Sequence, residues 1–227
     1  MLYVIVGGSK GLGRVIAGDL ARRGHEVVIA ARHADALQDA TASIRDAGGA
    51  VTAETVDLAS YESIDEFAAR IVARRTPLRA LIIAAAGFYK GAFGDQATDS
   101  LTLSLLQTFV GPARLVSRLI RECDSARPMD VILVTAVGAA TNLDASRSSA
   151  VHVTAKAALH VFGATVGREL LPTGVRVTTI APGTFQKDGA PGIPREFLAQ
   201  CVNFVIDSPP SVAFETIILR PTGVVVP

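Results

Sequence analysis

Short apolar runs rich in Val, Ile and Ala alternate along the chain with longer segments in which apolar residues recur every three or four positions. This alternation is typical of repeated strand and helix units that form a parallel sheet. The apolar runs are nearly continuous, as expected for strands that helices cover on both faces. Seven strands are predicted, at Leu2–Val6, Glu26–Ala31, Val51–Val56, Ala80–Ala85, Asp130–Val137, Val175–Ala181 and Glu215–Leu219.

The segments between these runs predict the helices. The first helix lies between the first two strands and stops at Gly24, after the basic pair Arg22 and Arg23. Further helices are predicted over residues 34–47, 60–75, 100–123, 149–171 and 194–206. Because no repeat or linker interrupts this order, residues 1–227 are predicted to form a single α/β domain, a doubly wound seven-stranded parallel sheet flanked by helices.

One long irregular stretch, Pro182–Ile193, follows the sixth predicted strand and is rich in glycine and proline. Loops of this length at the end of a strand often carry function. We therefore expect a short substrate-lid region at about residues 184–206.

The composition excludes several classes of protein. With 49% hydrophobic and 19% charged residues, the chain has enough apolar side chains for one sizeable core and too few charges for disorder. A formal net charge of +1 argues against nucleic acid or an anionic membrane as a partner, and no apolar run is long enough to span a bilayer. Cys123 and Cys201 form neither a metal-ligand spacing nor a disulfide framework, and no export signal follows Met1. A cytoplasmic protein without a metal site is expected.

A glycine-rich loop follows the first predicted strand. It would place the free N–H groups of the first helix where they could bind the pyrophosphate of a dinucleotide. The alternative is a tight strand-to-helix turn in which glycine is needed only for positive φ. The candidate cofactor-binding residues of the loop are Gly7, Ser9, Lys10, Gly11, Leu12 and Gly13.

The spacing of Gly7, Gly11 and Gly13 is the GxxxGxG form, and at this point the chain resembles the short-chain dehydrogenase/reductase family over nearly its whole length. The resemblance implies a Rossmann-type fold and a nicotinamide cofactor. It assigns Asp57-Leu58 to the adenine amino group, Ala84-Ala85-Ala86-Gly87 to the place of the family's Asn-Asn-Ala-Gly, Pro182-Gly183-Thr184 to the turn beside the nicotinamide carboxamide, and residues 215–222 to the last strand.

The choice between NAD and NADP rests on charge. NAD sites usually carry an acidic residue at the end of the second strand, where it would repel a 2′-phosphate. Here Ala31 ends that strand, and Arg32 follows with a guanidinium suited to bidentate phosphate contact. Lys10 could supply a second cation on the same side, whereas Arg14 and His33 are weaker candidates. NADP(H) is the expected cofactor.

The family's catalytic residues are a Tyr-x-x-x-Lys pair on a helix, a Ser at the end of the preceding strand and an Asn on helix four. The resemblance places Lys156 at the lysine and His152 at the tyrosine; four residues apart on a helix, they share one face. Matching the strand motif puts the serine at Ala136, and counting the family's usual interval back from position 152 puts it near Ala139; both residues are alanine. The nearest hydroxyl, on Thr135, is the third catalytic candidate, although its side chain is expected on the opposite face.

Helix four carries Thr108 beside Gln107 where the family has Asn. An imidazole titrates near pH 6.5 and can act as a general acid, and Lys156 nearby would lower the pKa of His152. One hypothesis is therefore an NADP(H)-dependent oxidoreductase acting on a small carbonyl or alcohol, with His152 in place of tyrosine. The alternative is a non-redox isomerase or cyclase, or a catalytically degenerate cofactor-binding protein, on the same fold.

The expected substrate is small and apolar. The pocket residues that suggest this are Phe88, Tyr89, Phe93, Leu143 and Phe185. By resemblance to the family, the chain is expected to form a homodimer or homotetramer, with the apolar positions of residues 149–171 in the subunit contact. No nucleic acid and no membrane is expected as a partner.

Overall fold

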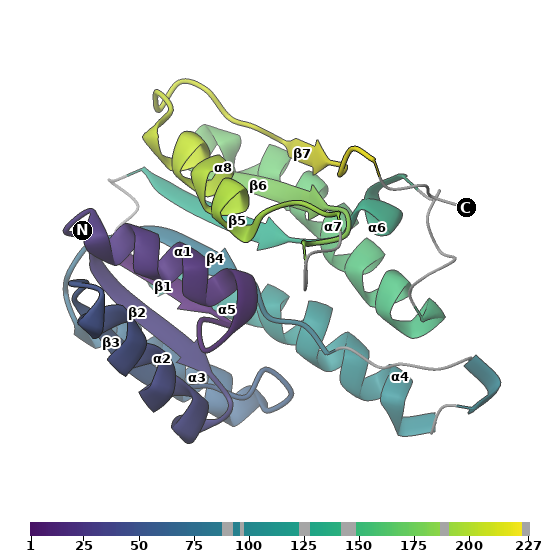
Figure 1. Cartoon of the computed structure of the whole chain (residues 1–227), viewed down its shortest axis with the longest axis horizontal. Helices are drawn as coiled ribbons and strands as arrows, with labels where there is room; N and C mark the ends of the chain where they lie inside the picture. The colour runs from purple at the N-terminus through teal and green to yellow at the C-terminus, as the bar shows by residue number, and fades with distance from the viewer. Residues whose placement is uncertain (88–92, 96–97, 123–127, 142–148, 187–190, 224–227) are drawn as a thin grey trace.

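A computed structural model describes residues 1–87, 93–95, 98–122, 128–141, 149–186 and 191–223. A seven-stranded sheet in the order β3-β2-β1-β4-β5-β6-β7 forms the centre of the molecule, and every pairing is parallel (Figure 1). This confirms the doubly wound α/β fold. The strands are β1 Leu2–Val6, β2 Glu26–Ala31, β3 Val51–Thr55, β4 Leu78–Ile83, β5 Met129–Val134, β6 Val175–Pro182 and β7 Thr216–Leu219.

Helices cover both faces of the sheet. The α-helices are α1 Gly11–Arg22, α2 Ala34–Asp46, α3 Tyr61–Ala73, α4 Thr98–Leu105, α5 Gly111–Glu122, α6 Val137–Thr141, α7 Ala150–Leu170 and α8 Arg195–Asp207. Short 3₁₀ turns lie at Phe93–Asp95 and Leu171–Thr173, and a π-helical turn, Leu106–Val110, joins α4 to α5. None of the described helices is both long and apolar enough to cross a membrane.

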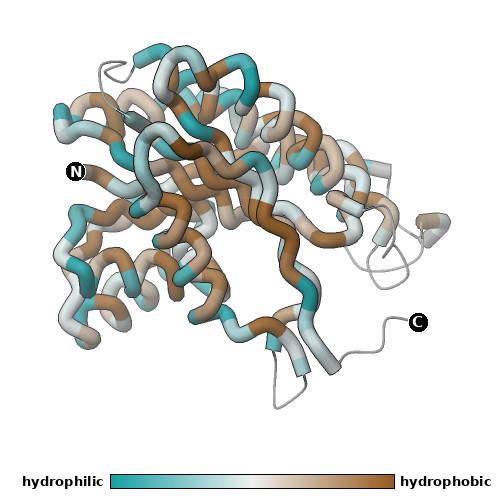
Figure 2. The backbone as a smooth tube through the Cα atoms, turned by 90° about the horizontal axis from the view of Figure 1, so that it is seen from above, coloured by the Kyte–Doolittle hydropathy of each residue, from teal (hydrophilic) through white to brown (hydrophobic). Residues whose placement is uncertain are grey.

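Successive residues of a strand point to opposite faces, and the core is divided accordingly into two clusters. In β1, Val4 packs with α3, α5 and α7, whereas Ile5 packs with α1, α2 and α8. Figure 2 shows the hydrophobic segments gathered in the central strands, with hydrophilic stretches on the outer helices. This two-sided burial explains why the strands are apolar at almost every position.

Two predicted boundaries are wrong for reasons that bear on the site. The fifth strand ends at Val134 instead of Val137, because the chain turns into α6, whose first turn contains a bond from the Ala139 N–H to the Ala136 carbonyl. The fourth strand ends at Ile83, so that residues 84–87 form a loop rather than the strand end.

The helix predicted over residues 100–123 is confirmed over residues 98–122, but a π turn at Leu106–Val110 divides it into α4 and α5. Pro112 has no N–H to donate, and its ring conflicts with the carbonyl four residues earlier, which disfavours a continuous α-helix. Gly111 follows the turn at a close approach: a Cβ there would lie 2.0 Å from the Leu58 carbonyl oxygen. The interruption brings α5 against the loop after β3 and sets the position of Gln107 and Thr108.

About half of the segment predicted as a lid is helix α8. Leu198, Val202 and Val205 of this helix are buried in the core cluster on the α1 side. Before α8, Phe185 and Ile193 form an isolated bridge. A lid role for residues 184–194 stays a prediction, and residues 187–190 lie outside the described part of the chain.

Candidate active site

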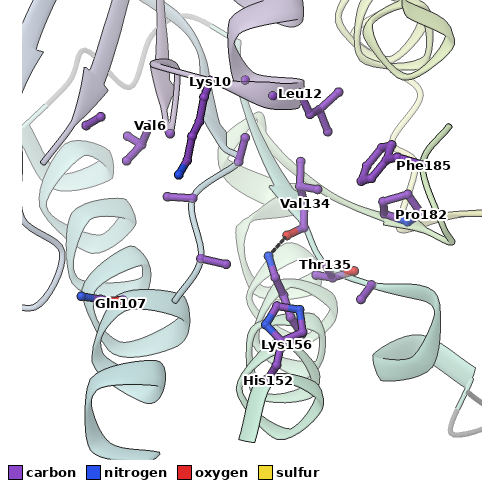
Figure 3. A pocket seen from close by; sticks show the side chains of 18 of the residues that line it. Val6, Lys10, Leu12, Gln107, Val134, Thr135, His152, Lys156, Pro182 and Phe185 are labelled. Carbon is purple, nitrogen blue, oxygen red and sulfur yellow. Dashed lines mark hydrogen bonds between the residues drawn. The ribbon is translucent and has the colours of Figure 1, made fainter. Parts of the chain in front are cut away.

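A pocket of about 770 Å³ opens at the carboxyl ends of the strands (Figure 3). It lies at the neighbouring strands β1 and β4, where the strand order of the sheet reverses direction. Open α/β sheets bind ligands at such switch points. Of the cofactor-binding candidates, Gly87 and the weaker candidate Arg14 are absent from the lining. The lining candidates are Gly7, Ser9, Lys10, Gly11, Leu12, Gly13, Arg32, Asp57, Leu58, Ala84, Ala85, Ala86, Thr135, His152, Lys156, Pro182, Gly183 and Thr184.

The glycine loop allows a close approach between β1, α1 and the loop after β4. Gly7 has φ +89°, and a Cβ on it would lie 2.6 Å from the Ala85 nitrogen. A Cβ on Gly13 would lie 2.3 Å from the Gly7 carbonyl oxygen. The N-cap residue Lys10 makes no side-chain bond to α1, so that, as far as the described residues show, the first N–H groups of the helix remain available at the pocket. The loop therefore satisfies both a packing requirement and the requirements of an anion site.

Two cations lie at the end of the pocket beside β2. Neither Lys10 nor Arg32 forms an ion pair within the described residues. The Arg32 guanidinium donates to Nε2 of His33 at 3.1 Å, which leaves its charge uncompensated. Asp57 also lines the pocket, and one of its carboxylate oxygens accepts the Ala59 N–H at 2.9 Å. This end of the pocket is suited to an anionic group.

Lys156 of α7 is buried among apolar side chains. Its ammonium donates to the Val134 carbonyl oxygen at 2.5 Å, as the dashed line in Figure 3 shows. Burial lowers the pKa of Lys156 from its ordinary 10.5 to about 8. Because the described residues supply one acceptor to this ammonium, the Val134 carbonyl, hydroxyl groups of a bound ligand can serve as its further acceptors.

His152 lies one helical turn before Lys156, and Figure 3 shows the two side chains on the same side of α7. Its Nδ1 is 3.3 Å from the Gly87 carbonyl oxygen. The pKa of His152 is lowered below 6.5, chiefly by burial and to a lesser extent by the charge of Lys156, while the bond to Gly87 opposes the shift. Burial therefore lowers the pKa of His152 more than the charge of Lys156 does, and the imidazole is predominantly neutral at pH 7.

The hydroxyl of Thr135 is poorly placed to act on a substrate. Although Thr135 lines the pocket, its Oγ1 donates to the Ile180 carbonyl at 3.3 Å, so that its hydrogen is already used. Ala136 also lines the pocket and carries no hydroxyl. Of the three catalytic candidates, His152 and Lys156 therefore remain as titratable groups in the pocket.

A profile described as short chain dehydrogenase matches residues 2–194. The chain belongs to the short-chain dehydrogenase family. It is an oxidoreductase of this type. Carbonyl reductase family member 4 of Danio rerio is 25% identical over 92% of this chain and 92% of its own.

Two further comparisons agree with this family. A fatty acyl-CoA reductase of Acinetobacter baylyi is 27% identical over 78% of this chain, which spans 60% of that longer protein. A metagenomic short-chain oxidoreductase solved in complex with NADP has the same fold, with a TM-score of 0.85, 22% identity, and coverage of 98% of this chain and 97% of its own.

Arg195 lines the pocket of this short-chain dehydrogenase and was missing from the candidates drawn from its sequence. Gln107 lines the pocket from the π turn, and Phe185 and Arg195 line it from within the predicted lid region, Phe185 near its start and Arg195 at the first position of α8. The Arg195 guanidinium lies 5.8 Å from the centre of the Phe185 ring. Arg195 is the first residue of α8, where the helix dipole disfavours a cation, and that unfavourable placement was the available signal.

Some candidates of the substrate pocket lie outside the described residues, namely Phe88, Tyr89 and Leu143. Phe93 is described and is 67% exposed. Of the apolar residues proposed for the mouth of the pocket, the structure thus places Phe185 in its lining.

Proposed function

We propose that this protein is an NADP(H)-dependent oxidoreductase that acts on a small carbonyl or alcohol, with His152 in the role of the family's tyrosine. The observation that carries the proposal is that one pocket joins the glycine loop and Arg32 at one end to His152 and Lys156 at the other. The NADP bound to the metagenomic oxidoreductase and the name of the Danio rerio relative agree with it.

The residues present fit a dinucleotide. The uncapped N-terminus of α1 and the space left by Gly7 and Gly13 suit a pyrophosphate, since a Cβ at either glycine would collide with main-chain atoms. Lys10 and Arg32 would hold the 2′-phosphate, and Asp57 the adenine amino group. The nicotinamide ring supplies the hydride when the cofactor is bound.

The chain itself positions the reactants and moves the proton. Lys156 would hold the ribose hydroxyls through its ammonium, and the apolar side chains of Val134, Val137 and Val153 line the same pocket, where they would limit the access of water. His152 would transfer a proton between its ring and the oxygen of the substrate. The loss of the family's serine leaves orientation of that oxygen to His152 and the pocket walls.

The change Arg32→Asp is expected to weaken NADPH binding by roughly 10-fold or more and to reverse the preference for NADPH over NADH, because an acid would repel the 2′-phosphate and bind the ribose hydroxyls. Fluorescence titration of both cofactors measures the two dissociation constants. Arg121→Asp is the matched control, because it makes the same change in charge on the exposed end of α5 and should leave the preference unchanged. Equal affinities of the wild type for the two cofactors would contradict the assignment.

We propose that the protein forms a homodimer or homotetramer, with fewer residues of α7 available for the subunit contact than the sequence predicted. Val151, Ala155 and Leu159 of α7 are buried within the subunit, so they are not available for a subunit contact. The opposite side of α7 still exposes 61% of Val161. Light scattering at micromolar concentration is expected to give a mass of at least two chains, and a monomeric mass would refute the proposal.

A further inference from the structure

The guanidinium of Arg195 brings a positive charge to the pocket. Within the described part of the chain it forms neither an ion pair nor a hydrogen bond. Its contact there is with the Phe185 ring, whose centre lies 5.8 Å away. The charge also stands at the first position of α8, where the helix dipole disfavours a cation. An anion bound beside Arg195 would offset both effects.

Helices α1 and α8 pack side by side on one face of the sheet, with apolar residues of both in the same core cluster (Figure 1). Asn203 of α8 donates to Asp19 of α1 at 2.5 Å. One turn further along both helices, Arg23 donates to Asp207 at 2.7 Å. Both pairs are 184 residues apart in the sequence, so the two helices run parallel and in a constant register.

The same register brings the starts of the two helices together at the pocket. Continued about two turns toward the N-terminal ends, it pairs Gly11 with Arg195, the first residues of α1 and α8. The pocket lining agrees, because it contains Gly11 and Leu12 of α1 as well as Arg195. Arg195 therefore lies beside the first turn of α1.

The segment before α8 fixes the position of Arg195. The Ile193 N–H donates to the Thr184 carbonyl at 2.9 Å, and the Gln186 N–H donates to the Ile193 carbonyl at 3.0 Å. These bonds hold the chain just before Arg195 against the chain that carries Phe185. A cation beside an aromatic ring is attracted without using its N–H groups. The donors of the guanidinium thus remain available for a ligand.

The first turn of α1 is the place proposed above for the pyrophosphate of the cofactor. Lys10 and Arg32 are assigned there to the 2′-phosphate, and Lys156 to the ribose. Of the lysine and arginine residues that the structure places in the pocket lining, Arg195 is the one that remains. A guanidinium can bind two phosphate oxygens through parallel N–H···O bonds.

We propose that the guanidinium of Arg195 binds the pyrophosphate of the dinucleotide, so that α8 as well as the glycine loop holds the cofactor. The inference rests on the proposed function, because it takes the dinucleotide as the ligand. The pyrophosphate is common to NADP(H) and NAD(H), whereas the 2′-phosphate belongs to NADP(H) alone. Arg195 is therefore expected to raise the affinity for both cofactors, and Arg32 to set the preference between them.

Titration of the variant Arg195→Gln with NADPH and with NADH, followed by fluorescence, tests the inference through binding alone. Both dissociation constants are expected to rise by roughly 10- to 100-fold, and their ratio to stay as in the wild type. The matched control Arg121→Gln removes the same charge at the exposed end of α5 and should bind both cofactors like the wild type. Unchanged dissociation constants in Arg195→Gln would overturn the inference. A loss confined to NADPH would also overturn it, because it would place Arg195 at the 2′-phosphate.

Reversal of the charge separates binding from a structural role. The start of a helix favours an acid, so Arg195→Glu should fold, and without cofactor it should melt no lower than Arg195→Gln. Its carboxylate would repel the pyrophosphate, so both dissociation constants should rise further than in Arg195→Gln. Equal dissociation constants in the two variants would contradict the inference. Should one variant fail to fold, the comparison of the other with the wild type and with Arg121→Gln decides.

The outcome for the proposed function is read from the wild type. A wild type that binds neither NADPH nor NADH would refute the proposed function, and the inference with it. A wild type that binds NADPH, together with an Arg195→Gln variant that binds it equally well, would refute the inference alone, because Lys10, Arg32 and His152 would keep their proposed roles.

Discussion

Replacement of His152 by alanine is expected to lower turnover by roughly 10²- to 10⁴-fold while NADPH binds almost as tightly as to the wild type. The reason is that no hydroxyl at the family's serine position can replace the imidazole: the Thr135 hydrogen is bonded to the Ile180 carbonyl, Ala136 has no hydroxyl, and the Lys156 ammonium is assigned to the ribose. Steady-state rates on a carbonyl or alcohol that the wild type converts, together with an NADPH titration, measure both quantities.

The variant His152→Gln is the matched test of proton transfer. Glutamine keeps a donor for the Gly87 carbonyl but does not titrate near neutral pH. We expect it to lose as much turnover as the alanine variant. The wild-type rate should change with pH below 6.5, because burial lowers the pKa of His152, and the glutamine variant should lack this change. Turnover close to that of the wild type in either variant would show that imidazole is not the proton carrier.

Replacement of Lys156 by methionine is expected to change binding and stability in opposite directions. The loss of a charge-assisted hydrogen bond to the ribose should weaken NADPH binding by roughly 10- to 100-fold. The protein without cofactor should be more stable by roughly 1–3 kcal/mol at pH 7, because the variant no longer buries a charge. A cofactor titration and urea unfolding measure the two effects.

The pH dependence of the free energy of unfolding tests whether the buried charge of Lys156 is the cause of that gain in stability. Between pH 8 and 10.5 the unfolded chain keeps a proton on Lys156 that the folded chain has released, so that the free energy of unfolding of the wild type should rise with pH by roughly 3 kcal/mol across this window. Lys156→Met should lack this rise. The control Leu159→Met, also buried on α7, should keep it. Equal slopes in Lys156→Met and the wild type would contradict the assignment of a buried cation.

The candidate site could be located from the sequence because its parts follow successive strands. In a parallel sheet all carboxyl ends meet at one edge, so the glycine loop, Arg32, Asp57 and residues 84–87 had to converge there once the strands were recognised. Arg195 was missed because it begins a helix after a long irregular stretch, and nothing in the local pattern directs that helix back to the pocket.

The sequence by itself determined the strand and helix order, the doubly wound sheet and the placement of His152 and Lys156 on one helical face, because all of these follow from local periodicity and from strand order. Tertiary structure alone decided the burial that sets the pKa of Lys156, the bond that uses up the Thr135 hydrogen, and the hydrogen bonds that join Gly87 to Thr108 and to His152. These features depend on contacts between segments that are far apart along the chain, and hydrophobic periodicity carries no information about which such atoms come within hydrogen-bonding distance.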